Sequence, residues 1–305
     1  MVLLLFLINA IFRGAGDAAI AMRSLWVANI CNLILDPLLI FGIGPFPELG
    51  LTGAAVATTI GRGTGVLYQF YRLAERNNRF TIRRDHLRLD PPLLSAMLRL
   101  SGTGMFQILI GTTSWIGLIR VISTFGSVAL AGYTVTMRIV IFAILPAWGM
   151  SNAAATMVGQ ALGARKPDRA EQAVWRAALY NVCFLAAWGL AFVLFAGPIA
   201  GLFTDDPVVQ MWGSRGLRIV AMGFLFYAYG MVVVTAFNGA GDTVTPTLIN
   251  LGCFWAFKIP MAYLLALPLG LGPRGVFIAI TIAYSVQAVV SGLLFRRGRW
   301  KLKKV

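Results

Sequence analysis

The chain has 305 residues, of which 58% are hydrophobic and 12% charged, and its mean hydropathy is +0.78. Soluble domains contain about 45–50% apolar and about 25% charged residues, so this composition excludes an ordinary soluble protein. The net charge of +15 resembles that of nucleic-acid-binding proteins, but the basic clusters abut long apolar segments and lack interleaved aromatic residues. We therefore expect an integral membrane protein surrounded by lipid, with no nucleic-acid partner.

Long apolar segments recur along the chain, and a helix needs about 20 mainly apolar residues to cross a bilayer. Residues 1–12 are apolar but too short to cross, and we interpret them as the end of a helix whose beginning is absent. We predict an all-α polytopic membrane protein with eight whole spans, near residues 19–43, 51–73, 93–123, 128–158, 173–196, 216–237, 244–268 and 274–295.

Basic residues gather between some of these spans and at the C-terminus, whereas the other loops carry acidic residues such as Glu48, Asp205 and Asp206. Cytoplasmic loops of membrane proteins are enriched in Lys and Arg. We expect a multi-pass protein of the plasma (inner) membrane with a cytoplasmic C-terminus. The basic residues on which this topology depends are Arg76, Arg79, Arg83, Arg84, Arg88, Arg99, Arg165, Lys166, Arg169, Arg296, Arg297, Arg299, Lys301, Lys303 and Lys304.

A sequence repeat indicates an internal duplication. Phe12-Arg13-Gly14-Ala15-Gly16-Asp17 returns as Phe237-Asn238-Gly239-Ala240-Gly241-Asp242, and Gly50-Leu51-Thr52-Gly53 aligns with Gly272-Pro273-Arg274-Gly275. Duplicated halves are typical of secondary transporters. We expect the C-terminal part of a first helix bundle at residues 1–73, a cytoplasmic linker at 74–92, a complete six-helix bundle at 93–295 and a basic tail at 296–305. Completing the first half by comparison with the second would need roughly 130 further residues.

Asp36 is the carboxylate that the sequence places well inside a span. Burying an ionisable side chain in a membrane costs free energy, so such a residue is by default expected to have a function. Asn32 lies four residues earlier, on the same helix face. Thr58 reaches a similar depth on the next helix, so these three residues are a predicted site for H⁺ or for a hard cation such as Na⁺. The competing interpretation is a permanent ion pair between Asp36 and Arg62.

Other polar and proline residues within spans are candidates for a role in transport. Lys258 lies two residues before Pro260. We expect its side chain either to attract an anionic group or to donate hydrogen bonds to backbone carbonyls freed by the proline. We expect Pro37 and Pro260 to occupy equivalent places in the two repeats, and they are candidate hinges. Gln107, Tyr133 and Met137 are candidates for lining a substrate cavity, with packed core positions as the alternative.

The sequence shows no arrangement of nucleophile and base and no glycine-rich phosphate loop, so we expect no enzyme activity. Its three cysteines, Cys31, Cys183 and Cys253, lie in apolar spans, and its single histidine, His86, lies in the linker. We therefore expect no disulfide framework, no metal cluster and no cofactor.

Several of these motifs resemble the multidrug and toxic compound extrusion (MATE) family of antiporters. The resemblance rests on the two Gly-Ala-Gly-Asp turns, the Asn32-to-Gly42 and Gly50-to-Thr58 segments, and Gly159-Gln160-Ala161-Leu162-Gly163. It implies two six-helix bundles around a central cavity, of which this chain holds the end of helix four through helix twelve. It also implies that Asp36 and Asn32 belong to the coupling network, with Thr58 the best match for a threonine of that network. Acidic residues of a second cation site in some relatives are absent from 93–123 and 210–237.

The resemblance implies a monomeric secondary exporter that exchanges cationic or amphipathic drug-like molecules for H⁺ or Na⁺. A lipid-linked oligosaccharide flippase of related architecture remains an alternative, supported by Lys258, Arg62 and Arg138. A truncated, non-transporting fragment is a second alternative, and a membrane-embedded enzyme is disfavoured because one buried carboxylate offers no acid and base pair.

Overall fold

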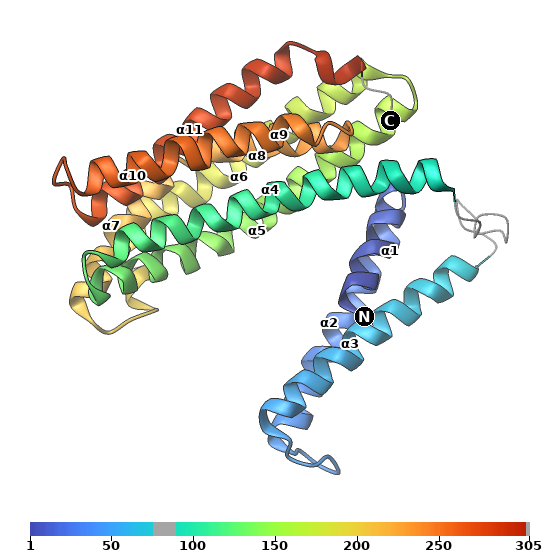
Figure 1. The fold of residues 1–305 in the computed structure, drawn as a ribbon. Coiled ribbons are helices and arrows are strands. Elements are labelled where there is room, and N and C mark those ends of the chain that lie inside the picture. The colour runs from blue at the N-terminus through green and yellow to red at the C-terminus, as the bar shows by residue number, and fades with distance from the viewer. Residues whose placement is uncertain (76–89, 303–305) are drawn as a thin grey trace. The chain divides into compact units, whose positions relative to one another are not determined.

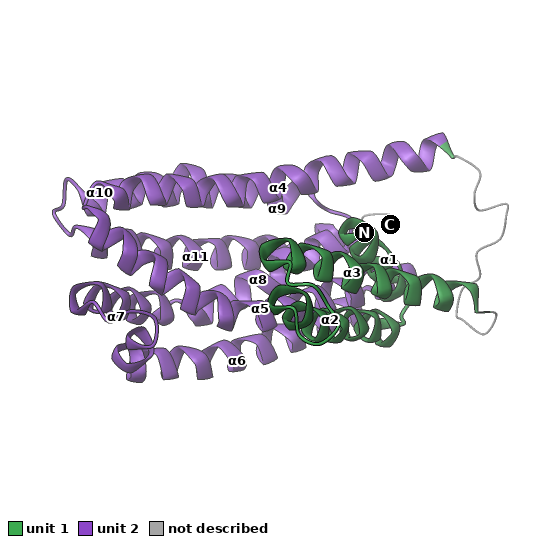
Figure 2. Cartoon of the chain, turned by 90° about the horizontal axis from the view of Figure 1, so that it is seen from below, with its two compact units in different colours: residues 1–90 green, residues 91–305 purple. Residues whose placement is uncertain are grey.

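The computed structural model describes residues 1–75 and 90–302. The chain divides into two compact units, unit 1 at residues 1–90 and unit 2 at residues 91–305 (Figure 2). The described residues form helices and no strand, which confirms the all-α prediction. His86 and the linker arginines Arg76, Arg79, Arg83, Arg84 and Arg88 lie outside the described residues, as do Lys303 and Lys304.

Unit 1 consists of α1 (Val2–Gly14), α2 (Ala18–Phe41) and α3 (Gly50–Ala74) (Figure 1). Helix α3 packs on α2 along Gly53, Ala57, Gly61 and Gly65, which recur every four residues and are all buried. A Cβ atom on Gly53 would lie 2.2 Å from the carbonyl oxygen of Leu39. Small residues at helix interfaces let membrane helices approach this closely.

A buried polar network joins the three helices of unit 1. The Ser24 hydroxyl donates to Asn9 Oδ1 over 2.8 Å, and Gln69 Nε2 donates to the same oxygen over 2.8 Å. All three side chains are fully buried. Ser24 and Asp36 are twelve residues apart, about 18 Å along an α-helix, so this network is separate from the carboxylate.

Unit 2 contains the remaining helices, and α5 contacts α6, α7 and α8. Its core is built mainly from small and branched apolar residues of these helices and of α11. The elements are α4 (Pro91–Ser123), α5 (Ser127–Gly163), α6 (Pro167–Gly201), α7 (Pro207–Met222), α8 (Phe224–Gly239), α9 (Val244–Asn250), the π-helix η2 (Leu251–Lys258), α10 (Ile259–Ala266), α11 (Pro273–Arg296) and the 3₁₀-helix η3 (Arg299–Leu302).

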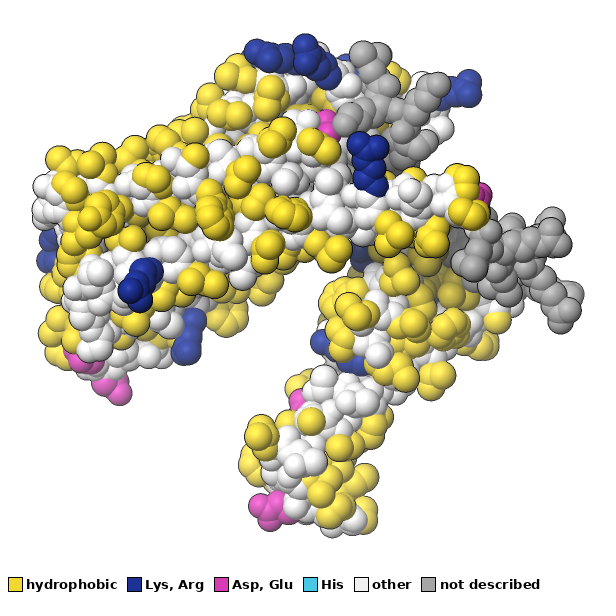
Figure 3. Space-filling model, in the orientation of Figure 1, with side chains coloured by type: hydrophobic (Ala, Val, Ile, Leu, Met, Phe, Trp, Pro, Cys, Tyr) yellow, Lys and Arg dark blue, Asp and Glu magenta, His cyan; other side chains and the backbone are white. Residues whose placement is uncertain are grey.

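Each predicted span contains helix, and six helical segments of the described residues are long and apolar enough to cross a membrane. The span predicted at 216–237 is instead the pair α7 and α8, bent by 57°. Helix α3 has 25 residues, but its Gly, Thr and Arg content keeps it out of that set. Apolar side chains cover the visible helix flanks, and Lys and Arg lie mainly toward the helix ends (Figure 3). These features support a multi-pass membrane protein.

The repeated hexapeptide forms the same turn twice. The Asp17 amide donates to the Phe12 carbonyl over 2.9 Å, and the Asp242 amide donates to the Phe237 carbonyl over the same distance. Gly16 and Gly241 supply the left-handed conformation, with φ of 87° and 74°. Asp17 and Asp242 then each accept a backbone amide three residues on, as helix N-caps. The repeat is therefore a helix end joined to the next helix start.

The C-terminal segment is fixed to the beginning of α6. Trp300 is buried, stacks on Phe295 at 4.6 Å and donates to the Phe295 carbonyl over 3.0 Å. Lys301 pairs with Glu171 at 2.5 Å and Asp168 at 3.5 Å. The hydrogen bond to Glu171 raises the pKa of Lys301, since the charged form is the one that donates.

Candidate ion and substrate sites

The carboxylate of Asp36 lies half-buried on α2 with one oxygen engaged and one free. Oδ2 accepts a hydrogen bond from Asn32 Nδ2 one helical turn earlier. Oδ1 is buried and has no hydrogen-bond partner within the described part of the chain. Buried polar atoms are nearly always paired, so this oxygen is an open position for a proton or a small cation.

The other two residues predicted around Asp36 are not bonded to it. Thr58 is exposed on α3, and in the described ranges no hydrogen bond joins it to Asp36 or Asn32. Arg62 likewise forms no ion pair with Asp36 there. The residue of α3 that meets Asn32 is Gly61, where a Cβ would lie 3.2 Å from the Asn32 Cβ. Among the described residues, Asn32 is therefore hydrogen-bonded to Asp36, and Arg62 forms no ion pair with it.

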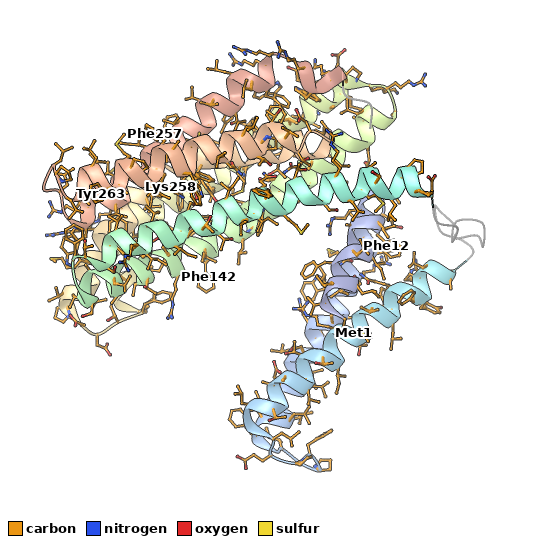
Figure 4. All side chains as sticks on the ribbon, in the orientation of Figure 1. Met1, Phe12, Phe142, Phe257, Lys258 and Tyr263 are labelled. Atoms are coloured by element: carbon orange, nitrogen blue, oxygen red, sulfur yellow. The ribbon has the colours of Figure 1, made fainter. Side chains whose placement is uncertain are left out.

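Lys258 is buried at the end of η2, with 1% of its surface exposed. Its ammonium donates to Ser114 Oγ of α4 over 2.9 Å. It also lies 4.3 Å from the ring centroid of Phe254, 5.3 Å from that of Trp115 and 5.6 Å from that of Tyr284. Figure 4 shows Lys258 between the α9–α10 segment and α4. The ammonium is thus enclosed by three aromatic rings and one hydroxyl.

The helix crossings of the two repeats show how their residues correspond. Gly53 meets Leu39 in the first copy, and Gly275 meets Leu265 in the second. Leu39 follows Asp17 by 22 residues and Leu265 follows Asp242 by 23, so the second copy has one extra residue. A π-helix turn accommodates such an insertion, and η2 lies in this interval.

This register corrects one prediction. Pro37 lies two residues before Leu39, but Pro260 lies five before Leu265, so the two prolines are not at equivalent places. The π-helix accounts for one residue of this three-residue offset, and the other two appear in the sequence, where Pro37 follows Asp17 by 20 residues and Pro260 follows Asp242 by 18. Lys258 and Asn32 each lie seven residues before the crossing, so these two are the equivalent positions.

Two neighbouring cavities within unit 2 share lining residues. The larger has a volume of about 600 Å³ and is lined by Gly104, Gln107, Ile108, Ile144, Trp148, Asn152, Tyr227, Met231, Val234, Thr235, Asn238, Thr243, Asn250, Phe254, Tyr284 and Gln287. The smaller includes Trp115 and Met137 and shares Ile144, Tyr227 and Tyr284 with the larger.

Two of the three predicted cavity residues line these spaces. Gln107 borders the larger cavity and Met137 the smaller, whereas Tyr133 is buried in the core against Phe277. The sequence analysis missed the amides that line the larger cavity: Asn152, Asn238, Asn250 and Gln287. A signal for them existed, since an amide in an apolar span requires a polar partner or a cavity, and Gln287 Nε2 does donate to Asn250 Oδ1 over 2.7 Å.

Known proteins resemble this chain in sequence and fold. The sequence model of the MatE family matches residues 105–264. The chain is 27% identical to the probable multidrug resistance protein NorM of Thermotoga maritima, over 97% of this chain and 64% of the relative. A relative from Shewanella oneidensis named FAD transporter is also 27% identical, over 97% and 65%. A crystal structure of MATE in the bent conformation has a TM-score of 0.88 at 27% identity, over 97% and 65%. The chain thus spans just under two thirds of the length of these proteins.

Proposed function

The chain belongs to the MATE family of transporters, and we propose that it acts as a secondary active exporter that exchanges cationic or amphipathic small molecules for H⁺ or Na⁺. The proposal rests on one observation above all. Asp36 is a carboxylate within a membrane span, held by Asn32 through one oxygen and open at the other.

An open carboxylate oxygen inside a membrane can take up and release the coupling ion. A proton or Na⁺ that binds there supplies the positive charge that pairs with the carboxylate. The bound ion then drives transport only if it binds one conformation more tightly than the other, since equal affinities shift no equilibrium. Asn32 belongs to the same site because the hydrogen bond that its Nδ2 donates to Oδ2 fixes the orientation of the carboxylate.

We further propose that the protein lies in the inner membrane with its C-terminus in the cytoplasm. The basic residues near the beginning of α6 and the end of α11 support this orientation under the positive-inside rule. The pairing of Lys301 with Asp168 and Glu171 holds the C-terminal segment at that same end of unit 2.

Asp36→Asn tests the coupling role directly. Asparagine keeps the size and a hydrogen-bonding oxygen but cannot take up a proton or carry the charge that holds Na⁺. In proteoliposomes with an imposed H⁺ or Na⁺ gradient, we expect the parent to transport ethidium and Asp36→Asn to lose gradient-driven transport at least tenfold. Glu48→Gln is the matched control, because it neutralises a carboxylate in the loop after α2 and should transport normally. Undiminished transport by Asp36→Asn would refute the assignment.

Two other functions remain to be separated by experiment. A flippase for lipid-linked oligosaccharides would transport a labelled lipid diphosphate and not ethidium, and Lys258 is the residue that favours it. A non-transporting fragment would show neither activity. The mass of the natively expressed protein on an immunoblot, compared with the 33.0 kDa of this chain, identifies the polypeptide to assay.

A further inference from the structure

The ammonium of Lys258 lies against aromatic side chains that line the cavities of unit 2. We propose that the larger cavity, of about 600 Å³, binds amphipathic molecules through an anionic group, a carboxylate, sulfonate or phosphate, for which Lys258 is the counter-charge. This rests on the proposed export function and concerns its amphipathic substrates: at this site the acidic member of a pair of similar compounds is preferred over the basic one.

The rings that enclose the ammonium are also walls of the cavities. Trp115 borders the smaller cavity, Phe254 the larger and Tyr284 both. Each ring centroid lies within 5.6 Å of Lys258 Nζ. An anion that contacts one of these rings in the cavity would therefore be attracted by the nearby ammonium, and this attraction is stronger in a protein interior than in water.

The Lys258 ammonium forms no ion pair with a carboxylate among the described residues of unit 2. The ammonium has three donors, and the hydrogen bond that it forms uses the neutral hydroxyl of Ser114. The residues lining the two cavities include no Asp or Glu. Asp242 adjoins the lining residue Thr243, but its carboxylate caps α9 through the amide and hydroxyl of Thr245. A buried charge without a counter-ion is costly, so an anionic ligand gains by supplying one.

The rest of the lining suits an amphipathic acid. Amide side chains of Gln107, Asn152 and Gln287 offer N–H donors that a carboxylate accepts. Trp148 and Tyr227 offer flat apolar surfaces for a ring system. A cationic ligand would also stack on these rings, but it would meet the field of the ammonium that already lies against Phe254.

The test compares two probes that share a ring system and differ in charge, 1-naphthylacetate and 1-naphthylmethylammonium. Each is titrated by calorimetry into the full chain in nanodiscs of neutral phosphatidylcholine. We expect the acid to bind at least tenfold more tightly than the amine. Lys258→Met has a side chain of similar length without the charge. It should bind the acid at least tenfold more weakly than the parent, and it should bind the amine as tightly as the parent or more tightly. Lys258→Arg should retain the preference for the acid.

Arg120→Met is the matched control, since it removes an exposed cation from α4, the helix that carries Ser114, and should bind both probes like the parent. The preference of the unmodified chain for the acid needs no variant, so misfolding of Lys258→Met cannot hide a negative result. Equal binding of the two probes, no binding of either, or a well-folded Lys258→Met that binds the acid within twofold of the parent would overturn the proposal. Binding is measured without a gradient, so its failure is distinct from a failure of ethidium export.

Discussion

The first copy of the duplicated helix pair, α2 with α3, carries Asn32 and Asp36 on the helix that approaches the glycine crossing. The second copy, α9 to α10 with α11, carries Lys258 at the position of Asn32 and Ala262 at that of Asp36. The turns and the crossings are alike in both copies because backbone geometry requires glycine there. The residues between turn and crossing meet no such requirement, so one copy has an amide and a carboxylate where the other has an ammonium and a methyl group.

The crossings should be the most sensitive feature that the copies share. In Gly53→Ala the new Cβ would lie 2.2 Å from a backbone oxygen, and in Gly275→Ala it would lie 2.6 Å from a backbone carbon. Because backbone cannot rotate away as a side chain can, we expect each substitution to lower the free energy of unfolding by about 3 kcal/mol. Thermal unfolding followed by tryptophan fluorescence and size-exclusion chromatography measures the loss.

Matched controls lie on α3 itself, which carries Gly53, and on η2, which packs against α11. Gly63 on α3 and Gly252 on η2 have no atom within 4 Å of an added Cβ, so alanine there should be neutral or slightly stabilising. If Gly53→Ala and Gly275→Ala were as stable as these controls, close packing at the crossings would not be required in either copy. The alignment that equates Lys258 with Asn32 would then lose its support.

The comparison also shows what the sequence could predict. The hexapeptide repeat predicted two equivalent helix junctions, because glycine and aspartate are required by a helix end and an N-cap whatever surrounds them. The residue count did not reveal the π-helix, since one inserted residue in an apolar segment leaves no compositional trace. Equating Pro37 with Pro260 was wrong by three residues, of which the π-helix accounts for one and the unequal spacing from Asp17 and Asp242 for two.

The candidate sites were predictable in part for a related reason. Asn32 and Asp36 lie on one helix, so their spacing alone places them on one face. Thr58 lies on another helix, and its depth in the membrane does not determine the direction in which it points. Tyr133 and Met137 also share a helix, yet one packs in the core and the other borders a cavity, and that difference depends on neighbours contributed by α7 and α11.

The aspartates of the two junctions should contribute different amounts to the free energy of unfolding. Asp17 accepts one backbone amide, whereas the more deeply buried Asp242 accepts the amide of Thr245 and, over 2.7 Å, its hydroxyl. We expect Asp17→Ala to cost about 1 kcal/mol and Asp242→Ala about 2 kcal/mol of unfolding free energy. Asp17→Asn is the control, since asparagine caps nearly as well. Equal losses at the two positions would show that the Thr245 hydroxyl adds nothing.

A third copy of the junction offers the finest test, because it lacks the glycine. Between α5 and α6 the amide of Lys166 donates to the Ala161 carbonyl over 2.8 Å, as Asp17 does to Phe12, but the left-handed residue is Arg165, with φ of 57°. A residue with a Cβ pays about 1 kcal/mol for that conformation. Arg165→Gly should therefore be more stable than Arg165→Ala by about 1 kcal/mol, because both variants lose the same charge and only glycine relieves the strain. If the two variants unfolded at the same temperature, the glycines at 16 and 241 would owe their presence to something other than the turn.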